Sequence, residues 1–101
     1  MDVDDFDVLL LSQVRLGIVA VLIERRHATF PELKELLGVT QGNLGIHLRK
    51  LEDGGYVAVD KEFADRRPRT TARLTPAGRQ AFLAHVERLA RIARGGGKAP
   101  A

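Results

Sequence analysis

Amide and basic side chains gather between Thr40 and Lys50, in the segment T-Q-G-N-L-G-I-H-L-R-K. Asn and Gln amides match the major-groove edge of adenine, Arg and Lys match phosphate, and an exposed isoleucine can contact a thymine methyl group. Leu44, Leu48 and Leu51, at positions i, i+4 and i+7, would turn inward in a helix and leave these groups on the outer arc. We therefore predict a DNA-reading helix that uses Thr40, Gln41, Gly42, Asn43, Ile46, His47, Arg49 and Lys50.

The alternative interpretation of this segment is an ordinary surface helix. Gly42 and Gly45 weigh against it, because each glycine inside a helix costs about 1 kcal/mol relative to alanine. In an ordinary surface helix nothing offsets that cost. In a helix whose backbone approaches a nucleic acid closely, the missing side chains make the approach possible. The two glycines favour DNA binding.

A second basic group follows in A-D-R-R-P-R, residues 64–69, which we expect to be the loop of a β-hairpin because Pro68 and Asp65 favour turns. Arginines at a hairpin tip can lie against phosphates or enter a narrow minor groove. The usual meaning of such a cluster is a solvated charge run, but its position after the predicted DNA-reading helix favours DNA. The predicted wing residues are Arg66, Arg67 and Arg69.

Residues for catalysis or metal binding do not form a recognisable set. The chain has no cysteine, and its three histidines lie far apart, each without a ligand partner three or four residues further along the chain. His47 is expected to pack or to meet a phosphate, and His85 to lie in a dimer seam. No phosphate-binding loop, carboxylate pair or nucleophile–base set is present in the sequence. We predict no metal, no cofactor and no enzymatic activity.

Two helices with a tight joint must hold the DNA-reading segment. Thr29 and Glu32 fit a capping box at the start of the first helix, and Gly38 fits its end. Thr40 fits the N-cap of the second helix, which should end at residues 53–55. The other predicted elements are a short helix from about Asp4, a helix over 12–26, a short strand at 28–29, strands at 56–63 and 70–74, and a helix over 77–94.

The last helix has two adjacent apolar seams, and a domain this small rarely covers both. A second copy of the chain would cover the remainder. We expect the first and last helices to form this interface, with Phe6, Leu9, Leu10, Phe82, Leu83, Val86 and Leu89.

Length and composition set the frame for these predictions. The chain has 101 residues, a formal net charge of +3 and a pI of about 9.8, with aspartates concentrated at the N-terminus. We expect one domain over residues 1–94 and a flexible tail over 95–101. No apolar run is long enough to cross a membrane, so a cytoplasmic location is expected.

In this order the segments resemble the winged-helix transcriptional regulators related to the MarR and ArsR groups. The resemblance extends from Ser12 to Leu89. It rests on Arg15-Leu16, Ile18-Val19, Phe30-Pro31-Glu32-Leu33-Lys34, Thr40-Gln41-Gly42-Asn43-Leu44, His47-Leu48, Leu51-Glu52, Gly55-Tyr56-Val57, Arg69-Thr70-Thr71 and Leu74-Thr75-Pro76-Ala77-Gly78-Arg79.

The resemblance implies an α+β, mostly helical winged helix-turn-helix with additional terminal dimerisation helices. It also implies a homodimer that binds double-stranded DNA at an operator and regulates transcription, with repression as the expected mode. The alternatives are a winged-helix protein-interaction module and a non-specific architectural DNA-binding protein. Whether a small-molecule effector acts on the protein is open at this point.

Overall fold

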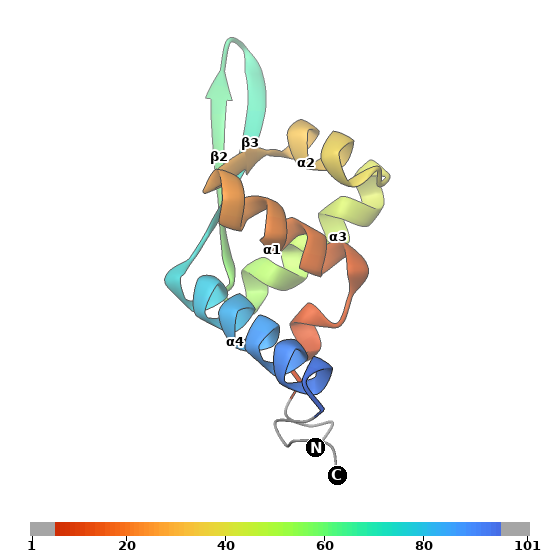
Figure 1. Ribbon diagram of the computed structural model, residues 1–101. Helices are drawn as coiled ribbons and strands as arrows, with labels where there is room; N and C mark the ends of the chain where they lie inside the picture. Colours follow the sequence, from red (N-terminus) through yellow and green to blue (C-terminus); the bar gives the residue numbers. More distant parts are fainter. Residues whose placement is uncertain (1–5, 96–101) are drawn as a thin grey trace.

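A computed structural model describes residues 6–95, which form an α+β winged helix, as predicted (Figure 1). Helices surround α1, and a hairpin projects from one end of the helical body (Figure 1). The elements are the 3-10 helix η2 (Val8–Leu10), α1 (Gln13–Arg25), β1 (His27–Thr29), α2 (Phe30–Leu37), α3 (Gln41–Asp53), β2 (Val57–Ala64), β3 (Arg67–Leu74) and α4 (Pro76–Ala93).

Helix α1 is the centre of the core, because it packs against α2, α3, α4 and β3. Ser12 caps its first turn by accepting a hydrogen bond from the Arg15 backbone N–H. Its fully buried residues are Ile18, Val19 and Leu22.

Local capping sets the helix-turn-helix as the sequence predicted. Thr29 and Glu32 form a complete capping box at the start of α2, and Gly38 ends that helix in the left-handed conformation, with φ at +64°. Thr40 caps α3 by accepting from the Asn43 backbone N–H at 3.1 Å. The predicted inward stripe of α3 is confirmed, since Leu44, Leu48 and Leu51 are buried.

The sheet has the order β1-β3-β2, and both pairings are antiparallel. The predicted loop over residues 64–69 is wrong, because only Asp65 and Arg66 form the turn. Both have positive φ, 53° and 63°, as a tight two-residue hairpin requires. Pro68 therefore lies in β3, opposite Phe63.

This position suits proline because β1 pairs only with residues 71–73 of β3. The pair next to a two-residue turn is hydrogen-bonded, so the following pair, Phe63 and Pro68, is a non-hydrogen-bonded one. The Pro68 nitrogen then faces the open edge of β3, where no N–H group is needed.

The predicted helix from about Asp4 is wrong within the described residues, where a three-residue 3-10 helix follows Asp7 instead. The Asp7 side chain accepts from the Leu9 backbone N–H and also from the Tyr56 hydroxyl. Burial, together with this bond to Asp7, raises the pKa of Tyr56 to about 12. The N-terminal segment is thereby tied to the end of α3.

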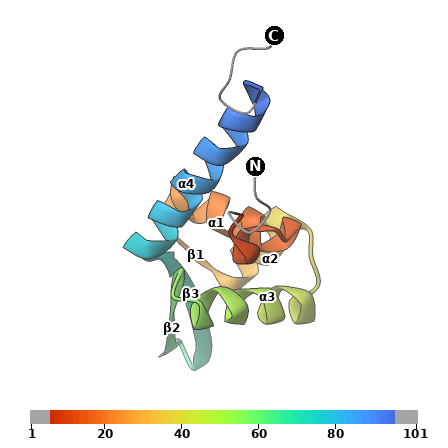
Figure 2. The ribbon, with the colours of Figure 1, turned by 90° about the horizontal axis from the view of Figure 1, so that it is seen from below.

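Helix α4 begins at the predicted Thr75 cap and extends away from the rest of the molecule (Figure 2). Gly78 is required where α4 meets the chain after α3, because an added Cβ would lie 2.2 Å from the Tyr56 carbonyl oxygen. The predicted tail lies outside the described residues from residue 96 onward.

Candidate nucleic-acid interface

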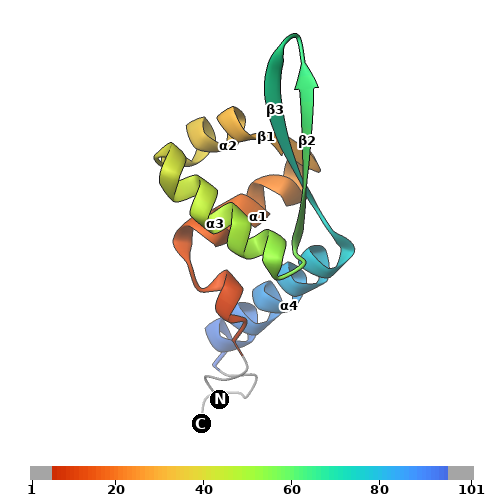
Figure 3. The ribbon, with the colours of Figure 1, turned by 180° about the vertical axis from the view of Figure 1, so that it is seen from behind.

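The outer arc of α3 is exposed and polar. Figure 3 shows α3 in front of α1, with the hairpin projecting at one end of the molecule. Because Leu44, Leu48 and Leu51 hold the helix to the core, the intervening positions must face outward. Ile46 is 58% exposed in the middle of the arc. The other exposed members of the predicted set are Thr40, Gln41, Gly42, Asn43, Arg49 and Lys50.

Gly42 and Gly45 in α3 have no packing role among the described residues 6–95. A Cβ added to Gly42 or Gly45 would meet nothing within 4 Å, whereas one added to Gly17, Gly54 or Gly78 would come within 3 Å of another atom. The space beside Gly42 and Gly45 is therefore open to an external molecule.

The charges of α3 are polarised along its axis. The N-terminal end carries the positive end of the helix dipole and unpaired backbone N–H groups, which attract phosphate. Arg49 and Lys50 add two positive charges, while Glu52 and Asp53 close the C-terminal end with negative ones. A polyanion is favoured at the N-terminal part of the helix.

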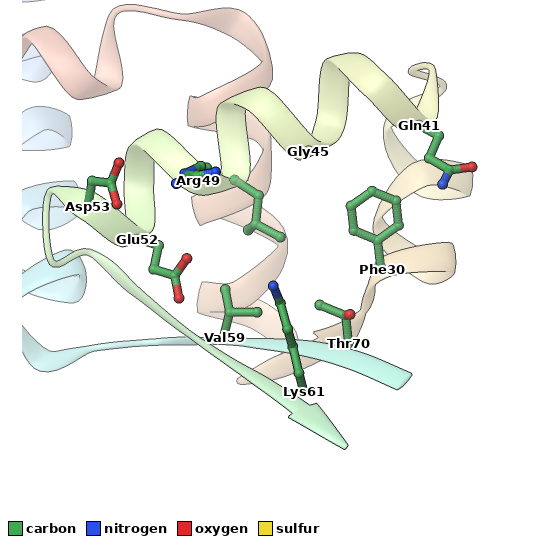
Figure 4. Close-up of a pocket in the computed structure, with 10 residues that line it drawn as sticks. Phe30, Gln41, Gly45, Arg49, Glu52, Asp53, Val59, Lys61 and Thr70 are labelled. Carbon is green, nitrogen blue, oxygen red and sulfur yellow. The ribbon is translucent and has the colours of Figure 1, made fainter. Parts of the chain in front are cut away.

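A groove of about 580 Å³ separates α3 from the hairpin (Figure 4). Gln41, Gly45 and Arg49 line it from α3, and Lys61 and Thr70 line it from the strands. Lys61 and Glu52 face each other across the groove in Figure 4. Helix α3 and the hairpin thus present one continuous surface.

The three wing arginines do not share one face of the hairpin. Arg66 lies in the turn. Arg67 and Arg69 lie on the same face of the hairpin, which also carries Glu62 of β2 and Arg73 of β3. Arg73 forms an ion pair of 3.5 Å with Asp60 on this outer face. The groove side of the hairpin is formed by the other face.

That groove-side face carries two residues that the sequence interpretation missed, Lys61 and Phe63. They continue the alternation of Val57 and Val59, whose side chains pack on the core. The period of two from residue 57 was the signal that could have identified them.

His47 is less accessible than the rest of the predicted DNA-binding set. It is half-buried, and its Nδ1 atom lies 3.0 Å from a guanidinium nitrogen of Arg15 in α1. Only the Nε2 side of the ring is left for a phosphate. His47 thus contacts α1 from its half-buried position, in line with one of its two expected roles.

The predicted dimer residues divide into buried and exposed groups. The prediction that Leu10 lies in the dimer interface is wrong, because its side chain is 1% exposed and belongs to the protomer's own core. Leu9 and Phe82 pack partly against that core, and His85 is buried at 3% exposure. Phe6 is half-buried. Leu83, Val86 and Leu89 remain exposed at 55%, 45% and 46%.

Two other kinds of site were sought in the described part of the chain. No group of three or more His, Cys, Asp or Glu side chains within residues 6–95 is placed to hold a metal ion. None of the helices in this range has the length and apolarity needed to span a membrane.

Comparisons with known proteins agree with this geometry. The winged helix DNA-binding domain family matches residues 14–93. A protein of Methanocaldococcus jannaschii is 36% identical over 83 residues, which cover 82% of this chain and 90% of that protein.

Solved structures give the same result. A transcriptional regulator homologue from Pyrococcus horikoshii superposes with a TM-score of 0.81 at 38% identity, with 86% of each chain covered. The transcriptional regulator BldR from Sulfolobus solfataricus gives 0.71 at 27% identity, over 87% of this chain and 62% of that one. The family predicted from the sequence is confirmed: this chain belongs to the winged helix DNA-binding domain family.

Proposed function

We propose that this protein is a sequence-specific transcriptional regulator that binds a pseudo-palindromic operator as a homodimer and represses transcription. The observation that carries the proposal is the outer arc of α3, where amide, basic and apolar side chains stand beside glycines that leave open space. This combination fits direct readout in the major groove. Family membership and the similarity to a transcriptional regulator homologue support it.

Within this proposal, Gln41 and Asn43 read base edges, because both lie in the first turn of α3. Arg49, Lys50, Thr40 and the free side of His47 hold phosphates. The hydroxyl of Thr40 accepts the capping bond from Asn43 and still has a proton to donate to a phosphate oxygen.

The homodimer is supported by the exposed apolar side chains of α4, Leu83, Val86 and Leu89. A dimer with two-fold symmetry would place two α3 helices in successive major grooves, about 34 Å apart. Half-site spacing is therefore a direct consequence of the proposed assembly.

The test is selection of bound duplexes from a random DNA library at physiological salt with purified protein. We expect an enriched inverted repeat with half-sites about one helical turn apart. Binding without enrichment would favour an architectural protein, and absence of binding would favour a protein-interaction module.

Variants at the helix start sharpen the test. Gln41→Ala and Asn43→Ala should weaken binding to the selected site more than binding to random DNA, by about 1–3 kcal/mol for a lost bidentate base contact. Equal losses on both DNAs would assign these residues to positioning rather than to readout. Reporter transcription from the selected site, with and without the protein, gives the sign of regulation.

A further inference from the structure

Phe63 is the most exposed large hydrophobic side chain among the described residues, at 74%. It lies on β2 one position before the residue that flanks the turn, and its cross-strand partner is Pro68. Side chains of a non-hydrogen-bonded pair are especially close, with Cα atoms about 4.5 Å apart. Phe63 and Pro68 therefore form one apolar tip, which we call the wing tip pair.

The wing tip pair stands beyond the part of the sheet that the core covers. On the same face, Val57 and Ala72 are buried, and Val59 packs partly on the core. Lys61 and Thr70 come next and line the groove facing α3. The wing tip pair continues this face toward the turn of the hairpin, and Pro68 also lines a hollow with Thr29, Phe30 and Pro31. The hairpin itself projects beyond the helical body (Figure 1, Figure 3).

The surroundings of the wing tip pair attract a polyanion. Lys61, Arg66, Arg67 and Arg69 are exposed within four residues of Phe63 or Pro68, and the acidic side chains in this stretch are Glu62 and Asp65. Residues 61–69 carry a net charge of +2. An apolar protein partner would have to desolvate these charges, whereas a nucleic acid backbone would pair with them.

The wing tip pair also lies on the same side of the hairpin as the recognition helix. If α3 occupies the major groove of a duplex, the hairpin face that lines the protein groove beside α3 meets the neighbouring DNA backbone and the adjacent minor groove. Proteins that bind the minor groove frequently insert Phe or Pro between base steps, which unstacks the step and bends the duplex.

We propose that the wing tip pair is an apolar wedge that enters the minor groove beside the α3 site, partly unstacks one base step and bends the DNA. Phe63 is the wedging side chain, Pro68 supports its ring, and the surrounding cations hold the flanking phosphates. The wedge selects pyrimidine–purine steps such as TA and CA/TG, because these are the easiest to unstack. This inference rests on the proposed DNA-binding function.

The experiment uses the full chain and the duplex selected from the random library, labelled at its ends for energy transfer and with 2-aminopurine at positions across the flank. With the wild-type protein we expect shortened end-to-end distance and increased 2-aminopurine fluorescence at one flanking step. Phe63→Ala should abolish both signals and lower affinity about tenfold, the order of magnitude for a lost apolar contact of this size. Phe63→Leu should keep most of the bend, since leucine also serves as a wedge.

Two controls separate the wedge from other effects. Leu36→Ala removes an apolar side chain of comparable exposure, 50%, from α2 and should change neither signal. Phe63→Ala should leave the salt dependence of binding unchanged, because no phosphate contact is lost.

The outcomes also separate the wedge from the proposed function. A bend and an affinity that Phe63→Ala leaves unchanged would overturn the wedge while leaving DNA binding intact. A change in oligomeric state of Phe63→Ala without DNA would overturn it in favour of a contact between copies of the chain. If the wild-type protein bound no duplex, both proposals would fall.

Discussion

The guanidinium of Arg15 in α1 lies 3.0 Å from Nδ1 of His47 in α3. Arginine is always charged and can only donate hydrogen bonds, so Nδ1 must be the acceptor and the ring proton belongs on Nε2. The same guanidinium donates to the Leu9 carbonyl oxygen at 2.8 Å and to that of Val8 at 3.4 Å. Arg15 therefore joins the N-terminal segment, α1 and α3 in one network.

This network makes stability depend on the protonation of His47. Burial, followed by the charges of Arg15 and Lys50, holds the pKa of His47 below its ordinary value of 6.5. Above pH 6.5 the ring is neutral in both the folded and the unfolded chain, so its contribution is fully present. As the pH falls through 6.5, the unfolded chain binds a proton that the folded chain resists, and the free energy of unfolding decreases until the folded ring also protonates.

We expect His47→Gln to remove this part of the pH dependence, because glutamine can still accept a bond from Arg15 but does not titrate. Urea unfolding between pH 8 and pH 5 measures the effect. His27→Gln, at an exposed position, is the matched control and should keep the wild-type profile. A His47→Gln profile identical to that of the wild type would contradict the assignment.

Gly42→Ala and Gly45→Ala should change stability and DNA binding in opposite directions. Alanine should raise the free energy of unfolding by up to about 1 kcal/mol at each site, because nothing in the chain obstructs a Cβ there and the helix gains propensity. The same methyl groups should weaken DNA binding where the backbone approaches the duplex. Thermal unfolding and binding isotherms test the pair of effects, and Gly78→Ala should only destabilise. Alanine variants that bind DNA as tightly as the wild type would contradict a close approach of the α3 backbone to the duplex.

Arg67→Ala should weaken binding to all DNA sequences and flatten the slope of log K against log salt by about 0.9, the value for one phosphate contact. Titrations at several salt concentrations give the slope. Arg91→Ala, an equally exposed position on α4, should leave it unchanged. If Arg67→Ala kept the wild-type slope, the outer face of the wing would not contact phosphate.

Leu83→Glu and Val86→Glu should separate the proposed dimer into monomers. A charge placed in an apolar interface loses the burial of the original side chain and must be desolvated, so the dimer dissociation constant should rise at least about tenfold. Sedimentation equilibrium measures it. Leu36→Glu introduces the same charge at an exposed leucine on α2 and should leave the assembly unchanged. A wild-type protein that sediments as a monomer would contradict the dimer itself.

Much of the fold was predictable because it depends on interactions between residues close in sequence. The Thr29–Glu32 capping box, the left-handed Gly38 and the Thr40 cap are fixed within four residues of chain, and each was recognisable from residue type alone. The leucine stripe of α3 follows from the helical period, so the identity of its outer arc could be predicted as well.

The turn of the wing needed the structure. Pro68 and Asp65 suggested a long loop, yet the chain pairs up to residue 64 and again from residue 67, since Pro68 has an open strand edge beside it. Strand pairing depends on which neighbour is present, and a local pattern does not contain that information. The register placed Lys61 and Phe63 on the strand face that lines the groove at Lys61, and Arg67 and Arg69 on the opposite face.

Residue types and spacing were enough to predict the helix-turn-helix and the outer arc of α3, because local caps and the helical period control them. Three features required the packed chain: Leu10 belongs to the core, Arg15 contacts His47, and Phe63 stands exposed on the strand face that carries Lys61. These features depend on contacts between segments far apart in the sequence. Arg15 and His47, for example, are 32 residues apart, and only the packed chain specifies them as partners.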